Sequence, residues 1–106
     1  MALTREYRTT VLERIKRDTE FAKAIYAEAL DALLNGETAE GLSMLRDLVH
    51  AQISFKELAV QTGFDEKSLH RMLSRRGNPT AKTLGRITSA IQDGLHFVPH
   101  VNIAAA

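Results

Sequence analysis

The chain has 106 residues, the length of a single domain that can bury a core without disulfides or bound metal. It contains no cysteine, so disulfide bonds and thiolate chemistry are excluded, and a reducing cytoplasm is the expected location. No apolar stretch is long enough for a signal peptide or a transmembrane helix, so no contact with a membrane is expected.

Residues 1–53 predict the N-terminal part of an all-α fold. Thr4, Asp18 and Thr38 are each placed to cap a helix, and Asn35-Gly36 is a typical helix end. Apolar residues recur at helical spacing in all three segments, which is more typical of a packed core than of a ligand groove. We therefore expect helices over about residues 4–17, 18–36 and 38–49.

The central stretch, residues 54–74, predicts two short helices joined by a glycine turn. Ser54 can cap the first helix, with Glu57 three residues later as the second member of a capping box. Gly63 permits the positive φ angle of a tight helix exit, and Asp65 can cap the second helix. This order of signals predicts a helix pair with a sharp turn.

The spacing within this pair resembles the helix-turn-helix of phage-type repressors. A small residue, Ala59, falls where two steeply crossed helices touch, and Gly63 falls at the turn. Leu69 and Met72 occupy the expected core positions of the second helix, whereas Thr62 stands where an aliphatic residue is more usual. An ordinary helical hairpin inside a bundle remains the alternative.

Charge is distributed unevenly along the chain. The segment before Ser54 has 7 basic and 9 acidic residues, whereas the remainder has 7 basic and 4 acidic residues. Between residues 67 and 86 every charged residue is basic: Lys67, Arg71, Arg75, Arg76, Lys82 and Arg86. A charge run is often only a solvated surface, but this one coincides with the second helix of the pair and the loop that follows. Binding of double-stranded DNA is therefore the favoured interpretation.

The residues expected to contact DNA follow from this placement. Exposed side chains near the start of the second helix reach base edges in a helix-turn-helix, and basic residues in the next loop reach phosphates. The predicted set is Ser54, Glu66, Lys67, Ser68, His70, Arg71, Arg75, Arg76, Asn78, Thr80 and Lys82.

A last helix is expected to support this pair. Pro79 lies outside it, Thr80 can serve as its N-cap, and it is expected to end near Gly94. The predicted architecture is a helical bundle of five to six helices. It comprises an N-terminal segment, residues 1–53, the DNA-binding region, residues 54–94, and a tail, residues 95–106, all within one compact domain.

The tail has a different character. Residues 95–103 alternate in a two-residue rhythm that is typical of a β-strand, and Pro99 restricts such a strand to an edge. Because a lone strand needs a partner, we expect Phe97, Val101 and Ile103 to form a homodimer interface. A disordered tail is the alternative.

The chain as a whole resembles the HigA-like antitoxins, also called addiction-module antidote proteins. The resemblance covers residues 4–94 and is carried by segments 18–21, 29–36, 45–49, 67–73 and 77–80. It implies an antitoxin of a type II toxin–antitoxin module, which neutralises a RelE-like mRNA-cleaving toxin and represses its own operon. The sequence departs from the family pattern after Gly94.

Catalysis has little support in the sequence. His50 and His70 lie on separate predicted helices, and Pro99 interrupts the helix that His96 and His100 would need to share a metal. We expect neither an enzyme nor a bound cofactor or metal. The alternative to an autorepressing antitoxin is a stand-alone repressor, or a helical interaction module without a toxin partner.

Overall fold

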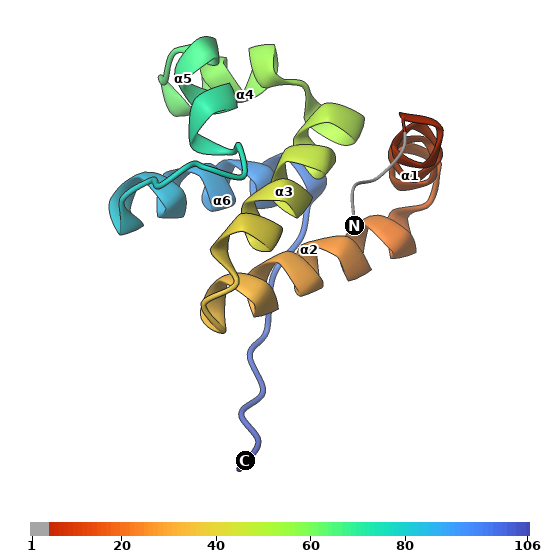
Figure 1. Ribbon diagram of the computed structural model, residues 1–106, viewed down its shortest axis with the longest axis vertical. Coiled ribbons are helices and arrows are strands. Elements are labelled where there is room, and N and C mark those ends of the chain that lie inside the picture. The colour runs from red at the N-terminus through yellow and green to blue at the C-terminus, as the bar shows by residue number, and fades with distance from the viewer. Residues whose placement is uncertain (1–4) are drawn as a thin grey trace.

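The computed structural model describes residues 5–106, and all the regular structure in this range is helical. The predicted all-α class is therefore confirmed. Figure 1 shows α4 and α5 together at one end of the molecule, above α3 and α6. The elements are α1 (Arg5–Arg17), α2 (Thr19–Leu34), α3 (Thr38–Leu48), a π-helical turn η1 (Val49–Ile53), α4 (Phe55–Thr62), α5 (Glu66–Met72) and α6 (Ala81–Leu95).

Local capping chemistry sets the bounds of α2, whereas α3 begins without a side-chain cap. The carboxylate of Asp18 accepts a hydrogen bond at 3.1 Å from the backbone N–H of Phe21, which confirms the predicted cap. The prediction for Thr38 was wrong, because Glu37 occupies the N-cap position without a side-chain hydrogen bond and Thr38 is already helical. The predicted cap at Thr4 lies outside the described residues.

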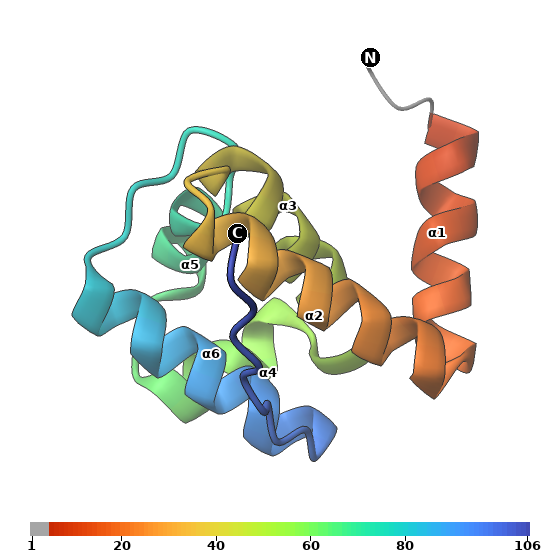
Figure 2. The same ribbon diagram turned by 90° about the horizontal axis from the view of Figure 1, so that it is seen from below.

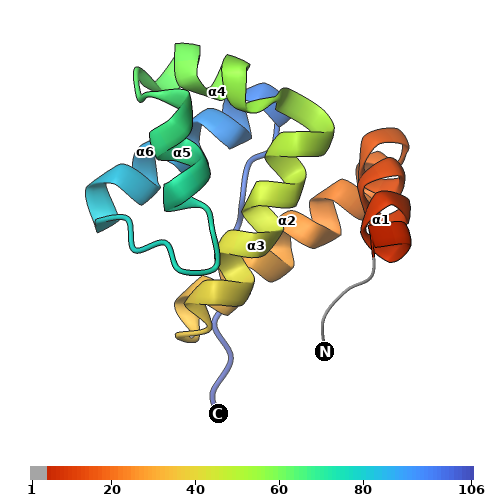
Figure 3. The same ribbon diagram turned by 45° about the horizontal axis from the view of Figure 1, so that its top comes forward.

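A single apolar core joins the helices. α2 packs along α3, while α4, α5 and α6 close the core from the other side (Figures 1 and 3). The largest side chains without solvent exposure are Ile15, Leu42, Leu45, Leu48, Val49, Leu58, Leu69, Leu73, Ile87 and Ile91. Burying each contributes about 1.5–3 kcal/mol relative to exposure, so this shared core is the main source of stability.

Polar contacts fix α1, which stands at the edge of the molecule (Figure 2). Ile15 is its only buried residue among those described. The Gln52 side-chain amide, from η1, donates to the Ile15 carbonyl at 2.6 Å, and Arg8 pairs with Asp47 of α3 at 2.5 Å. The position of α1 therefore depends on a few long-range polar contacts as well as on packing.

The two halves of the chain share one core. Tyr26 on α2 is buried, and its hydroxyl donates to the Gln92 side-chain oxygen on α6 at 2.5 Å. Burial raises the pKa of Tyr26 to about 12. The contact joins the N-terminal helices to the helix that follows the α4–α5 pair.

The prediction of a C-terminal strand was wrong, because no strand forms among residues 5–106. Leu95 belongs to α6, and the Phe97 ring packs against Tyr26 with centroids 6.0 Å apart. Val101 and Ile103 are 72% and 89% exposed on a segment that extends away from the helices (Figure 1). Phe97 therefore does not share a surface with Val101 and Ile103, and the expected apolar face is divided because Phe97 packs on Tyr26.

Candidate nucleic-acid interface

Side-chain caps and a glycine define the α4–α5 pair as the sequence predicted. The Ser54 hydroxyl accepts from the backbone N–H of Glu57 at 3.1 Å, and Gly63 ends α4 with φ 79°. Asp65 begins α5 by accepting from the backbone N–H of Ser68 at 3.1 Å. The turn between the helices is therefore short and defined at both ends.

The entry to α4 has a feature that the sequence did not reveal. Ser54 has φ 97°, which is a strained conformation for a residue with a side chain. Its backbone N–H donates to the Val49 carbonyl at 2.7 Å and closes the π-helical turn. That N–H is thus already engaged, and Glu57 does not complete the reciprocal half of the predicted capping box.

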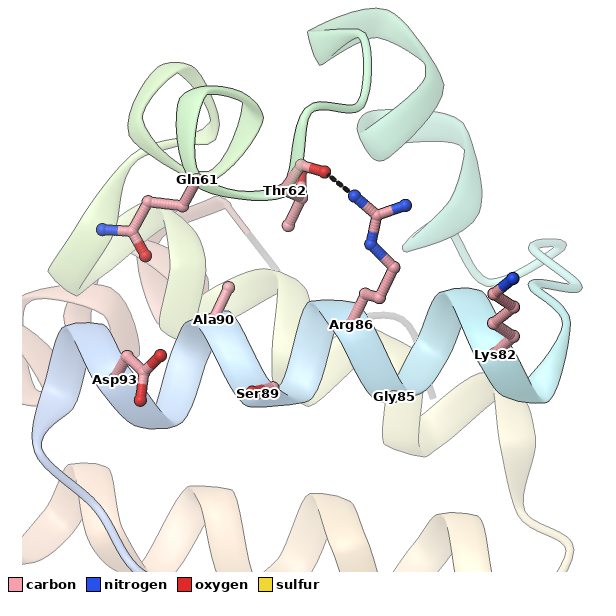
Figure 4. Close-up of a pocket in the computed structure, with 8 residues that line it drawn as sticks. All are labelled: Gln61, Thr62, Lys82, Gly85, Arg86, Ser89, Ala90 and Asp93. Carbon is pink, nitrogen blue, oxygen red and sulfur yellow. Dashed lines mark hydrogen bonds between the residues drawn. The ribbon is translucent and has the colours of Figure 1, made fainter.

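The departure at Thr62 is compensated by hydrogen bonds. Thr62 is buried; its hydroxyl donates to the Leu58 carbonyl at 2.7 Å and accepts from the Phe64 backbone N–H at 3.2 Å. Arg86 donates to the Thr62 carbonyl (Figure 4). Its guanidinium also lies over the Phe64 ring, 4.4 Å from the ring centroid. Arg86 therefore supports the turn from below and is not a free cation of the basic run.

The first turns of α5 bring several predicted residues together. Lys67 and Arg71 are exposed, and the Arg71 guanidinium lies 3.4 Å from the Ser68 hydroxyl. Glu66, also exposed, is in the first helical turn, where the helix dipole favours a negative charge. Leu69 is fully buried beneath them, so α5 presents one polar face outward and anchors the other in the core.

His70, a predicted DNA contact, also touches aromatic side chains of other elements. Its ring stacks on Phe55 of α4 with centroids 3.8 Å apart and a 16° interplanar angle, and it lies 5.8 Å from the His50 ring. Burial, followed by the nearby positive charge of Arg46, lowers the pKa of His50. His70 is thus part of the α4–α5 packing contact, and its side chain remains partly exposed.

The loop after α5 carries exposed cations. Arg76 and Asn78 are exposed, and Arg76 has no acidic partner among residues 5–106. Arg75 lies 3.4 Å from Glu40 of α3, with both side chains largely exposed. Such an exposed pair contributes only about 0–1 kcal/mol, so a phosphate can replace Glu40 at little cost.

The beginnings of α4 and α6 add two exposed lysines. Thr80 caps α6 by accepting from the backbone N–H of Thr83 at 3.2 Å, as predicted, and Lys82 is exposed in its first turn. Lys56 is exposed in the first turn of α4 and was not among the predicted contacts. Its position two residues after the Ser54 cap was the signal in the sequence for including it.

Other kinds of site find little support. Among residues 5–106, no group of three or more histidine, aspartate or glutamate side chains is arranged to hold a metal ion. No helix within the same range has both the length and the apolar character needed to cross a membrane. Comparison of the chain with protein-family models, with curated proteins and with solved structures finds no match.

Proposed function

We propose that this chain is a sequence-specific repressor of double-stranded DNA in which α4 and α5 form a helix-turn-helix. The observation that carries the proposal is the face of α5, where Lys67 and Arg71 are exposed directly above the buried Leu69. An α-helix fits the B-DNA major groove, and a recognition helix contacts base edges near its N-terminal end. The stable turn on either side of Gly63 holds α5 in one orientation.

In this proposal the cations divide into two roles. Arg71 reads a base, since arginine donates two hydrogen bonds to guanine O6 and N7 in the major groove. Arg76 and Arg75 contact phosphates, with Arg75 exchanging Glu40 for the DNA backbone. Lys56 and Lys82, at the beginnings of α4 and α6, are placed as further phosphate contacts.

The experiment that tests DNA binding is fluorescence anisotropy with a duplex selected from a random library and with an unselected duplex. We expect Arg71→Ala to weaken binding to the selected duplex by about 1–3 kcal/mol, with less loss on the unselected one. Arg76→Ala is expected to weaken both equally and to reduce the salt slope by about one. Arg17→Ala, which removes an exposed arginine from α1, is the matched control.

Two outcomes would contradict these roles. Equal losses on both duplexes for Arg71→Ala would remove its base-reading role. Binding that remains unchanged in both Arg71→Ala and Arg76→Ala would remove α5 from the interface altogether. The absence of any duplex enriched over the random library would contradict sequence-specific binding.

We also propose that the repressor acts as an antitoxin against a RelE-like toxin. The support is the resemblance to HigA-like antitoxins over residues 4–94, and the autorepression that it implies agrees with DNA binding by the α4–α5 pair. Purification of the native chain followed by identification of co-purifying proteins tests this. Recovery of a small mRNA-cleaving protein is the expected result, and recovery of the chain alone favours a stand-alone repressor.

A further inference from the structure

A second group of basic and titratable side chains lies next to α5, apart from the basic run of residues 67–86. It consists of Arg46 in the last turn of α3, His50 in η1 and His70 in α5. The His50 and His70 rings lie 5.8 Å apart, and both pack on Phe55, with ring centroids 4.8 and 3.8 Å away. Because Phe55 is buried, it holds the two imidazoles in a fixed arrangement.

Arg46 carries a positive charge that the chain does not neutralise. The carboxylate of its neighbour Asp47 is paired with Arg8 of α1 at 2.5 Å. Arg46 itself forms no ion pair among residues 5–106, and its buried Nε atom has no hydrogen-bond partner in this range. A buried donor without a partner is rare in folded proteins. The Nε atom of Arg46 therefore gives up no hydrogen bond when the side chain turns toward an external anion.

The same positive charges act on His50. Burial lowers the pKa of His50, and Arg46, His70 and Arg8 lower it further by their charge. His50 is nevertheless exposed, so an anion can approach it from solution. An anion bound there offsets the repulsion and favours the protonated imidazole. The group is therefore suited to an anion and unsuited to a cation.

This group and the loop after α5 lie at opposite ends of α3. Arg75 of the loop contacts Glu40 in the first turn of α3, whereas Arg46 is in its last turn. In Figure 3 the loop passes the beginning of α3, and the end of α3 lies closer to α1. At 1.5 Å per residue, Glu40 is about 9 Å from Arg46 and about 15 Å from His50. The B-DNA major groove is about 12 Å wide, so the two sets of cations are spaced like the phosphates that border it.

We infer that Arg46 and His50 form a binding site for a backbone phosphate of DNA, on the opposite border of the major groove from Arg75 and Arg76. The inference rests on the proposed DNA-binding function and extends the interface to the end of α3 and to η1. The guanidinium and the protonated imidazole each donate a hydrogen bond to phosphate oxygens. Because His70 on α5 adjoins His50, the site lies directly beside the proposed recognition helix.

Fluorescence anisotropy with the selected and the unselected duplex tests the site. Arg46→Gln is expected to weaken binding to both duplexes about fivefold at about 0.15 M salt and to reduce the salt slope by about one. His50→Glu is expected to weaken both at least as much, because a carboxylate repels the phosphate. Arg46→Lys keeps the charge and is expected to keep the slope. Arg17→Gln and His100→Glu make the same changes at exposed positions of α1 and the tail and serve as controls.

Two further measurements separate the contact from the fold and from free phosphate. The carboxylate of His50→Glu lies near Arg46, so this variant is expected to melt no lower than the unmodified chain, and its weaker binding then reports on the contact. In an NMR titration, the duplex is expected to raise the pKa of His50 and to leave that of His100 unchanged. Inorganic phosphate at the same concentration is expected to move neither.

Three results would overturn the inference. If Arg46→Gln and His50→Glu bind like their controls while Arg76→Ala weakens binding, the chain binds DNA without this site. If inorganic phosphate raises the pKa of His50 as much as the duplex does, the site belongs to free phosphate. A chain that binds neither duplex would overturn this inference together with the proposed function.

Discussion

The Arg8–Asp47 ion pair offers a sharp test of how α1 is held, through the substitution Arg8→Ala. Asp47 is only 9% exposed, and the Arg8 guanidinium lies 2.5 Å from its carboxylate across 39 positions of sequence. Burial raises the pKa of Asp47, while Arg8 and Arg46 oppose that rise. Removing Arg8 therefore leaves a buried carboxylate with less compensation.

The expected loss lies between two limits. Breaking a fully buried pair by removing one partner costs about 3–5 kcal/mol, whereas an exposed pair contributes about 0–1 kcal/mol. The Arg8 side chain is 34% exposed and the Asp47 side chain 12%, so this pair is screened on one side only. We expect Arg8→Ala to lower the free energy of unfolding by about 2 kcal/mol at pH 7, equivalent to roughly 10 °C in melting temperature.

Urea unfolding followed by circular dichroism at acidic and neutral pH distinguishes charge from packing. Because the folded state raises the pKa of Asp47, folding favours its protonated form, and its contribution is fully present below the unfolded pKa of 3.8 and is lost as pH rises through the folded pKa. Removing Arg8 raises that folded pKa further. The loss is therefore expected to be small near pH 4 and full at pH 7.

The control for this prediction is Asp47→Asn, which keeps the shape of the side chain without its charge. Arg8→Ala/Asp47→Asn is expected to recover most of the stability that Arg8→Ala loses at pH 7. An equal loss at both pH values, or no recovery in the double variant, would refute the electrostatic reasoning. Arg8 would then act through the packing of its methylene groups on α3.

Two further predictions concern Tyr26 and Gly77. Burial raises the Tyr26 pKa from 10.0 to about 12, so its contribution is present below pH 10 and lost as pH rises through about 12. Tyr26→Phe removes the hydrogen bond to Gln92 and is therefore expected to lower the free energy of unfolding by about 1 kcal/mol at pH 7. In urea titrations at alkaline pH the variant and the unmodified chain are expected to become equally stable. A difference that stays constant with pH would contradict this. At Gly77 an added Cβ would lie 2.1 Å from the Met72 carbonyl oxygen, so Gly77→Ala is expected to destabilise the fold by about 2 kcal/mol or more and to weaken DNA binding. An added Cβ at Gly85 would meet nothing within 4 Å, and alanine favours a helix more than glycine does. Gly85→Ala is therefore expected to stabilise the fold by about 1 kcal/mol in the same urea titration. Equal stabilities for the two alanine variants would refute this reasoning.

The parts of the fold that the sequence predicted well depend on short-range chemistry. Asp18, Ser54, Asp65 and Thr80 each cap a helix through a backbone group three residues away, so both partners are visible in one short stretch. The helical spacing of apolar residues likewise predicted that these segments are helices, although it did not identify the buried side of α2, where Leu34 is exposed and Tyr26 is buried. The prediction of Thr38 as a cap was wrong because a threonine near the start of a helix is compatible both with the N-cap position and with the first helical turn.

The parts that could not be predicted depend on distant partners. Alternation in the tail indicates a strand only where a second strand supplies hydrogen bonds, and Phe97 instead packs on Tyr26, which is far away in sequence. The sequence placed His70 on the outer side of α5, but its ring also stacks on Phe55 and lies near His50, both from other elements. The Arg8–Asp47 pair could not be predicted either, because its two residues lie 39 positions apart in the sequence.

The same distinction bears on how the basic run is interpreted. Counting charges between residues 67 and 86 treats six cations as equivalent, yet Arg86 is engaged by the Thr62 carbonyl and the Phe64 ring. Arg75 remains exposed but shares its charge with Glu40, so it reaches a phosphate only by leaving that partner. The exposed cations of this run without an acidic partner among residues 5–106 are therefore Lys67 and Arg71 of α5, Arg76 and Lys82. Lys67 and Arg71 stand on a helix anchored by Leu69, so their charges are held in a fixed arrangement. A fixed arrangement is what reading a DNA sequence requires and general attraction to phosphate does not.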